Sequence, residues 1–189
     1  AHPFIVENEL VLMHNGSLPT HKHLAKADVD SEAIAKYLHE HWDDDATPLE
    51  KANVLGKIGG AWALVWYDLR TEKLNIVRNS QRPLHIFTDK DVTFWASDEH
   101  MLRCSLSRNS FFGQVKAVPT YTLLTFSESG LQEVVLPTTA FFPTTVIHTA
   151  KTYITPTASS KNSPNGWVSK NMFKRIQKDM VGKKLVFNV

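Results

Sequence analysis

The feature that most constrains the fold is the run AWALVWYDL at residues 61–69, which is almost continuously apolar and rich in β-favouring side chains. A strand with apolar residues at successive positions must be covered on both faces. The β-favouring runs KLNIVRN, LHIFT and VTFWAS follow it, separated only by RTE, SQRP and DKD. Short turns favour antiparallel neighbours, so the sequence predicts a meander of four strands.

Two helices are predicted before this run. Apolar residues recur at helical spacing in residues 31–42, with Asp30 or Ser31 as a suitable N-cap. Residues 48–58 form the second helix, since a proline lies in the first turn and Gly59-Gly60 follows its end.

The rest of the first 136 residues also divides into short elements. Strands are expected at 4–6 and 10–13, a short helix capped by Asp98 at 98–106, and three strands between 114 and 136, the last two joined by a turn at 128–130. This order predicts an α+β domain whose helices pack on largely antiparallel sheets.

Composition divides the chain into a body and a tail. Residues 1–136 hold 13 Lys/Arg against 18 Asp/Glu, whereas residues 137–189 hold 8 against one. We expect a folded domain at 1–136, a Thr/Ser/Pro-rich arm at 137–166, and a basic amphipathic helix with a terminal strand at 167–189. The tail is predicted to dock on a protein partner; nucleic acid or an anionic membrane surface is the alternative.

Several classes of protein are disfavoured. No run of about 18 apolar residues predicts a membrane-spanning helix, and the start does not resemble a signal peptide. The single cysteine, Cys104, precludes an internal disulfide, and we expect it to be a buried apolar side chain. These features favour a soluble cytoplasmic protein.

The stretch LVLMHNGSLPT, residues 10–20, is the first candidate for chemistry. A strand that ends in Asn15-Gly16 is compatible with a simple turn. It is also compatible with half of an anion-stabilising site, because an amide side chain and an adjacent glycine N–H supply two fixed donors.

Five segments agree in order with a known family. They are AHPF…LVLMHNG (1–16), DVDSEAIAKYL (28–38), GAWALV, R…RPL and ASDEHML. Over roughly residues 1–130 the chain resembles the glutaminase domain of the class II glutamine amidotransferases, which are N-terminal-nucleophile hydrolases. The resemblance implies a four-layer αββα sandwich, here without its N-terminal strands.

The resemblance also implies a chemistry. The thiol of an N-terminal Cys attacks the side-chain amide of glutamine, ammonia leaves for transfer to an acceptor, and water releases glutamate. Asn15 and Gly16 would hold the oxyanion, and Asp30 the substrate's α-ammonium, unless Asp30 is only a helix cap. We place His14 beside the substrate, where it would pack or orient the loop rather than act as a base.

The chain departs from the family's pattern at the nucleophile. Its first residue is Ala1, and the family's carboxylate-binding arginine lies upstream of the AHP segment. We therefore expect the chain to be a piece or processed product that needs an N-terminal segment or another subunit, and to be inactive alone. Whether it is an enzyme stays open: the alternative is a non-catalytic structural or interaction protein with the same fold.

No metal ion or cofactor is predicted. The HEH motif at 39–41 invites a metal interpretation, but residues two apart on a helix point in nearly opposite directions, so His39 and His41 would not share an ion. The acidic WDDD stretch at 42–45 is expected to be a solvated helix end. We expect a structural role for His2, and structural or interface roles for Arg78 and Arg82, which flank the turn before Pro83.

Overall fold

The computed structural model describes residues 2–89 and 92–142, all of which belong to one compact unit. The expected basic helix and most of the expected arm lie outside these residues. At the start of the expected arm, a 3-10 turn, η1 (Thr138–Ala140), is followed by Phe141, whose ring lies 4.7 Å from that of Tyr121. Packing of the domain therefore continues a few residues past 136.

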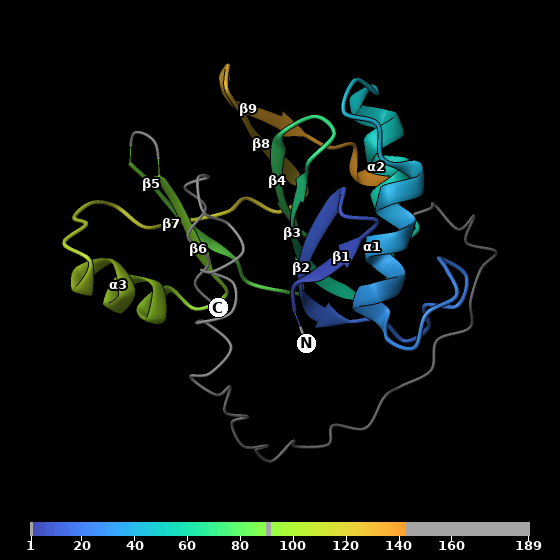
Figure 1. Cartoon of the computed structure of the whole chain (residues 1–189), viewed down its shortest axis with the longest axis horizontal. Helices are drawn as coiled ribbons and strands as arrows, with labels where there is room; N and C mark the ends of the chain where they lie inside the picture. Colours follow the sequence, from blue (N-terminus) through green and yellow to red (C-terminus); the bar gives the residue numbers. More distant parts are fainter. Residues whose placement is uncertain (1, 90–91, 143–189) are drawn as a thin grey trace, which may run out of the picture. The chain divides into compact units, whose positions relative to one another are not determined.

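One six-stranded antiparallel sheet holds most of the strands (Figure 1). In spatial order its members are β1 (Phe4–Val6), β2 (Leu10–Ser17), β3 (Ala61–Asp68), β4 (Lys73–Arg78), β8 (Thr122–Ser127) and β9 (Gly130–Val135). The β3 strand lies inside the sheet, and its residues 62–66 are all buried, as the apolar run predicts.

Two helices cover one face of this sheet, α1 (Asp30–His41) and α2 (Pro48–Gly56). The α2 helix begins at a capping box, in which Thr47 accepts from the Glu50 N–H and the Glu50 side chain accepts from the Thr47 N–H. Inward-facing residues of the helices and the strands form one core, which includes Ile34, Leu38, Leu55, Leu64 and Trp66.

A second, three-stranded sheet has the order β6 (Val92–Ala96), β5 (His85–Asp89) and β7 (Lys116–Ala117). The α3 helix (Glu99–Arg108) packs on it through Leu102 and Leu106, against Phe87 and Phe94. Asp98 caps α3 by accepting from the Met101 N–H at 2.8 Å, as predicted. The mixed α/β class with antiparallel sheets is thus confirmed, while the four-layer stacking stays a prediction.

The predicted four-strand meander is wrong. β3 and β4 pair with each other, but β5 and β6 belong to the other sheet. Asn79 accounts for the break, because its side-chain oxygen accepts from the Gln81 N–H at 3.0 Å and its amide donates to the Gly60 carbonyl at 2.8 Å. These bonds end β4 by tying it to the start of β3, and the chain leaves for the second sheet.

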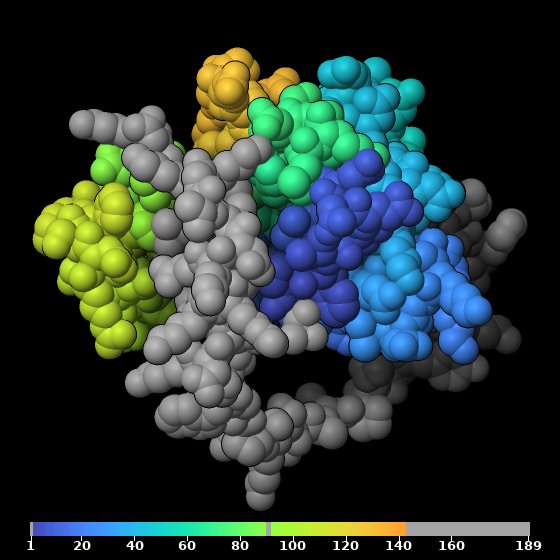
Figure 2. Space-filling model, viewed as in Figure 1, coloured from blue at the N-terminus to red at the C-terminus, as the bar shows by residue number. Residues whose placement is uncertain are grey.

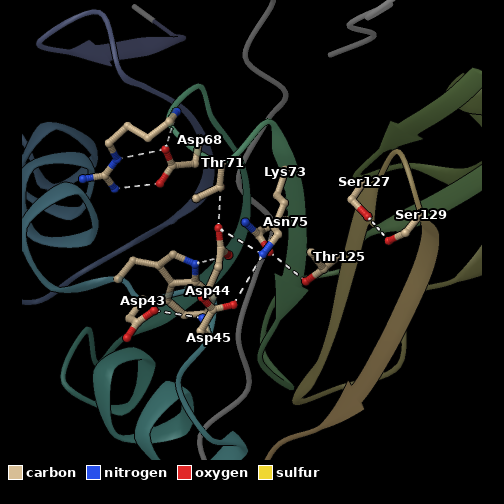
Figure 3. A network of polar contacts seen from close by, with 12 residues as sticks. Asp43, Asp44, Asp45, Asp68, Thr71, Lys73, Asn75, Thr125, Ser127 and Ser129 are labelled. Carbon is tan, nitrogen blue, oxygen red and sulfur yellow. Dashed lines mark hydrogen bonds and ion pairs between the residues drawn. The ribbon is translucent and has the colours of Figure 1, made fainter.

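The acidic stretch after α1 also differs from expectation. Asp44 is not solvated: its side chain is 5% exposed, accepts from the Trp42 indole N–H at 2.9 Å and from Thr71, and lies 3.9 Å from the Lys73 ammonium (Figure 3). Asp45, in contrast, is 97% exposed. The middle carboxylate therefore ties the end of α1 to the β3–β4 turn, because it accepts from the buried Trp42 side chain on one side and from the exposed Thr71 hydroxyl on the other.

Candidate functional site

The segment His14-Asn15-Gly16 lies inside β2 and is not a turn. The strand continues to Ser17, with Asn15 opposite Ala63 and Gly16 opposite Trp62 of β3. Side chains alternate along the strand, so His14 is buried on the face that carries Leu12, whereas Asn15 is exposed on the other face. Pairing with the long apolar strand β3 extends β2 beyond the four residues that were predicted.

Close packing leaves no room for a side chain at Gly16. A Cβ atom there would lie 1.9 Å from the Ala61 carbonyl oxygen and 2.5 Å from His14 Nε2. Glycine therefore lets the backbones of β2 and β3 and the His14 ring approach each other at this point.

The hydrogen-bond pattern directs the Gly16 N–H away from β3. Trp62, opposite Gly16, turns its own N–H and carbonyl toward Asn79, with distances of 3.3 and 3.1 Å. Antiparallel pairs alternate between bonded and non-bonded positions, so Trp62 leaves the Gly16 N–H outside the β2–β3 ladder. On the other side, the pairing of β1 with β2 ends at Leu12. The Gly16 N–H thus points to the β1 side of β2, beyond the last described β1–β2 pair.

Asp30 is the first residue of α1 and joins that helix to the chain just after β2. Its Oδ2 accepts from the Leu18 N–H at 3.0 Å, and its Oδ1 accepts from the Ser31 N–H at 2.8 Å. The N-cap position belongs to Val29, which makes no side-chain cap, so the expectation of an Asp30 or Ser31 cap is wrong by one or two positions. A carboxylate in the first turn is nevertheless favoured by the helix dipole.

Ser31 links Asp30 to His14, and sequence reasoning missed this role. His14 Nδ1 lies 2.9 Å from Ser31 Oγ, which in turn lies 3.4 Å from Asp30 Oδ1. The only signal in the sequence is a hydroxyl beside the acidic residue that opens the helix. The three side chains form a polar chain from the buried face of β2 to the start of α1.

The charge states of this chain follow from its burial. Burial lowers the pKa of His14 from 6.5 to about 4, although the nearby Asp30 charge opposes the change. Burial also pushes the pKa of Asp30 upward, but hydrogen bonds from Leu18 and Ser31 and the charge of His14 outweigh it, so the net shift is downward. At neutral pH the pair is a neutral imidazole beside a carboxylate.

Two further basic side chains lie near His14. The His2 ring is perpendicular to the His14 ring, with centroids 6.4 Å apart, and the Arg82 charge contributes to the lowered pKa of His14. Within the described residues, His2 Nε2, His14 Nε2 and Arg82 Nε are buried without a hydrogen-bond partner. The Ala61 carbonyl is close enough to His14 to raise its pKa slightly but does not meet hydrogen-bond geometry. These three nitrogen atoms therefore have unused hydrogen-bonding capacity beside the end of β2.

Cys104 lies on α3 and is exposed, so the prediction of a buried thiol is wrong. It occupies the outer surface of the helix, 3.6 Å from His100 Nε2, whereas Leu102 and Leu106 face the core. The apolar character of a cysteine does not decide which face of a short helix it occupies. Neither the fold nor the hydrogen bonds bring Cys104 to the residues at the end of β2.

Among the described residues, no helix is long and apolar enough to cross a membrane.

Comparisons with known proteins give a fold but no sequence match. No protein-family model matches the chain, and no curated protein matches it. Among solved structures, glutamine phosphoribosylpyrophosphate (PRPP) amidotransferase from B. subtilis, complexed with ADP and GMP, is 19% identical with a TM-score of 0.52, over 69% of this chain and 30% of that one. An allosteric regulatory enzyme of purine biosynthesis is 20% identical with a TM-score of 0.52, over 71% and 30%.

A glutamine aminotransferase class-II domain protein from Silicibacter pomeroyi is 17% identical with a TM-score of 0.47, over 72% of this chain and 70% of that one. The chain thus spans about a third of the length of the first two structures. Their likeness establishes that the greater part of this chain has the fold found within the B. subtilis amidotransferase.

Proposed function

We propose that this chain supplies the oxyanion-stabilising and ammonium-binding part of a glutamine amidotransferase, which hydrolyses glutamine to glutamate and passes the ammonia to an acceptor. One observation carries the proposal. The exposed Asn15 amide and the outward Gly16 N–H lie at the end of β2, and Asp30 is bound to the backbone two residues beyond Gly16. The fold shared with the B. subtilis amidotransferase supports it.

In the proposed reaction, a thiolate attacks the side-chain carbonyl carbon of glutamine and the carbonyl oxygen becomes an oxyanion. Asn15 Nδ2 and the Gly16 N–H donate to that oxygen. Collapse of the tetrahedral intermediate breaks the C–N bond and leaves a thioester, and the nitrogen departs as ammonia with the proton that the thiol gave up. Water then cleaves the thioester to release glutamate and the thiol. The β2–β3 pairing fixes the backbone of Asn15 and Gly16 before the substrate arrives, which limits the reorganisation that opposes the reaction.

Asp30 would bind the α-ammonium of glutamine. Its lowered pKa keeps the carboxylate ionised at neutral pH. An ionised carboxylate offers about four lone pairs, and Oδ2 accepts one hydrogen bond, from Leu18. Room for a further donor therefore remains on that oxygen, while the existing bonds fix its position.

Residues 1–189 do not contain the nucleophile in this proposal. Their one cysteine, Cys104, is on the surface of α3. We assign the attacking thiol and the group that binds the glutamine carboxylate to a segment outside residues 1–189 or to a second chain.

The test is glutamine hydrolysis by the protein expressed from its complete gene. Asn15→Ala is expected to lower kcat by about 100-fold or more, because loss of one oxyanion donor costs about 2.7–4 kcal/mol. Ser17→Ala, at the other exposed side chain near the end of β2, is the matched control and should retain activity. Equal activity in the two variants would contradict the proposal.

A non-catalytic protein with this fold is the second candidate, and specific contacts favour it. The Ala61 carbonyl already requires glycine at position 16, and both oxygens of Asp30 accept structural hydrogen bonds. An electrophilic glutamine analogue distinguishes the candidates, since a working amidotransferase is labelled stoichiometrically in competition with glutamine. Absence of labelling in the complete gene product supports the non-catalytic protein.

A further inference from the structure

The turn between β1 and β2 brings two carboxylates to an imidazole of α1. One ligand atom each from Glu7, Glu9 and His39 lies within 4.8 Å of the other two, and His39 Nε2 is 2.8 Å from Glu9 Oε2. Glu7 and Glu9 lie in the β1–β2 turn and His39 on α1, whereas Asn15 and Gly16 lie near the opposite end of β2. The cluster is therefore separate from the site described above.

The cluster opens into a groove between β1 and α1. Its walls are the residues Phe4, Ile5, Val6, Glu7, Glu32, Lys36, His39 and Glu40. Figure 2 shows the β1–β2 segment (dark blue) lying against α1 (lighter blue) on the visible face. Glu7 and His39 line this groove, so a hydrated ion can reach both, and Glu9 lies 2.8 Å from His39.

The nearby cations are already paired. Lys36 lies 2.7 Å from Glu32, and Arg70, which also feels the Glu9 charge, donates twice to Asp68 at 2.9 and 2.6 Å. The His39–Glu9 pair accounts for one carboxylate. Glu7 adds a second negative charge beside it, and like charges at this separation repel each other. A bound dication would remove that repulsion.

We propose that Glu7, Glu9 and His39 bind a divalent transition-metal ion of the Zn²⁺ class. One imidazole nitrogen and two carboxylate oxygens, with water in the fourth position, match the ligands that Zn²⁺ takes at about 2.0–2.2 Å. Tetrahedral ligands at those lengths lie about 3.4 Å apart. The His39–Glu9 contact has to open slightly, and the exposed Glu7 side chain is free to rotate inward.

The HEH pattern does not predict this site, because the residues that lie beside His39 belong to the β1–β2 turn and not to α1. His41 belongs to the same motif but packs its ring against Tyr37, with centroids 4.6 Å apart, and is not part of the cluster. A metal at Glu7, Glu9 and His39 would join the β1–β2 hairpin to α1 and thereby fix the strand that carries Asn15. This inference is independent of the proposed amidotransferase activity.

The test is calorimetric titration of the full chain with Zn²⁺, with Mg²⁺ and Ca²⁺ in separate runs. We expect one Zn²⁺ per chain, at least tenfold weaker binding in His39→Gln and in Glu7→Gln, and unchanged binding in the matched control His41→Gln. Binding of Zn²⁺ should also raise the Tm of the parent chain, and this rise should be absent in the two cluster variants. Far-UV circular dichroism checks that each variant is folded.

Three results overturn the site. They are no Zn²⁺ binding by the parent chain, equal affinity of the parent and both cluster variants, and an equal loss in His41→Gln, which would assign binding to surface histidines in general. Tighter binding of Ca²⁺ or Mg²⁺ than of Zn²⁺, unaffected by His39→Gln, would also contradict the proposal, because it would show that the carboxylates bind the ion without His39. Because Glu7 is an exposed turn residue, its variant keeps the test decisive if His39→Gln fails to fold.

Discussion

Asp30 Oδ2 accepts a hydrogen bond from the Leu18 N–H at 3.0 Å, so the first residue of α1 holds the backbone that follows β2. A single carboxylate thus sets the spacing between the strand that carries Asn15 and the helix that covers the sheet. In the proposed function the same carboxylate binds substrate, so its structural and chemical roles have to be separated by experiment.

Substitution of Asp30 separates them. Asp30→Ala leaves the Leu18 N–H without its charged acceptor and should lower the free energy of unfolding by about 1–3 kcal/mol. Asp30→Asn keeps one acceptor oxygen but loses the charge, so it should be more stable than Asp30→Ala and still raise the KM for glutamine. Urea denaturation and steady-state kinetics measure the two effects. An unchanged KM in a folded Asp30→Asn enzyme would remove Asp30 from the substrate site.

Stability should fall with acid because of His14. The pKa of His14 is about 4 in the folded chain, below the ordinary histidine pKa of 6.5 that applies in the unfolded chain. As the pH falls from 6.5 toward 4, the unfolded chain therefore takes up a proton that the folded chain does not, and this favours unfolding. The full difference is about 3 kcal/mol at a shift of about 2.5 pH units. Asp30, whose folded pKa is lowered, adds a further loss only at more acidic pH, below its ordinary value of 3.8.

Urea unfolding at a series of pH values measures this dependence. His14→Gln should flatten the curve between pH 6.5 and 4, whereas His100→Gln, at an exposed position on α3, should leave its slope unchanged. Equal slopes for the parent chain and His14→Gln would show that His14 is protonated as readily in the folded as in the unfolded chain.

Much of the secondary structure could be predicted from the sequence because local rules decide it. The apolar run at 61–69, the helical spacing at 31–42 and the Pro48 start of α2 each predict an element that the structure contains. The partners of strands are harder to predict. A short turn such as SQRP resembles a hairpin turn, and only the side-chain bonds of Asn79 reveal that the chain leaves the sheet there.

The candidate site shows the same limit. Asn15, Gly16 and Asp30 could be selected from the order of short motifs, and the structure places all three around the end of β2. Ser31 and the Asp44 network were missed, since a serine or an aspartate has no pattern that announces a buried partner distant in sequence. The apolar character of a cysteine predicts burial, but Cys104 lies two residues from Leu102 and Leu106 on α3 and therefore faces solvent.

Gly16→Ala tests whether glycine is required by packing alone. The added methyl group would overlap the Ala61 carbonyl oxygen, a backbone atom that cannot rotate away, so β2 and β3 must separate. We expect a loss of about 3 kcal/mol or more in the free energy of unfolding, at the upper end of overpacking costs. Gly59→Ala is the control: its Cβ would meet open space, and only its φ of +65° is strained, at about 1–2 kcal/mol. Thermal denaturation compares the stability of the two variants. An equal loss of stability in both would mean that β2 and β3 accommodate the added methyl group without much strain.

Two adjacent carboxylates after α1, Asp44 and Asp45, allow the effect of burial on stability to be compared directly. Asp44 accepts from Trp42 and Thr71 and faces Lys73, whereas Asp45 is almost fully exposed. Asp44→Ala removes the acceptor of the buried Trp42 indole N–H and leaves the Lys73 charge with weaker compensation, so we expect it to lower the free energy of unfolding by about 2–4 kcal/mol. Asp45→Ala should change it by no more than about 0.5 kcal/mol, as is usual for exposed sites. Matched urea titrations of the two variants measure the difference, and similar losses in both would show that the Asp44 network contributes no more than a solvated helix end.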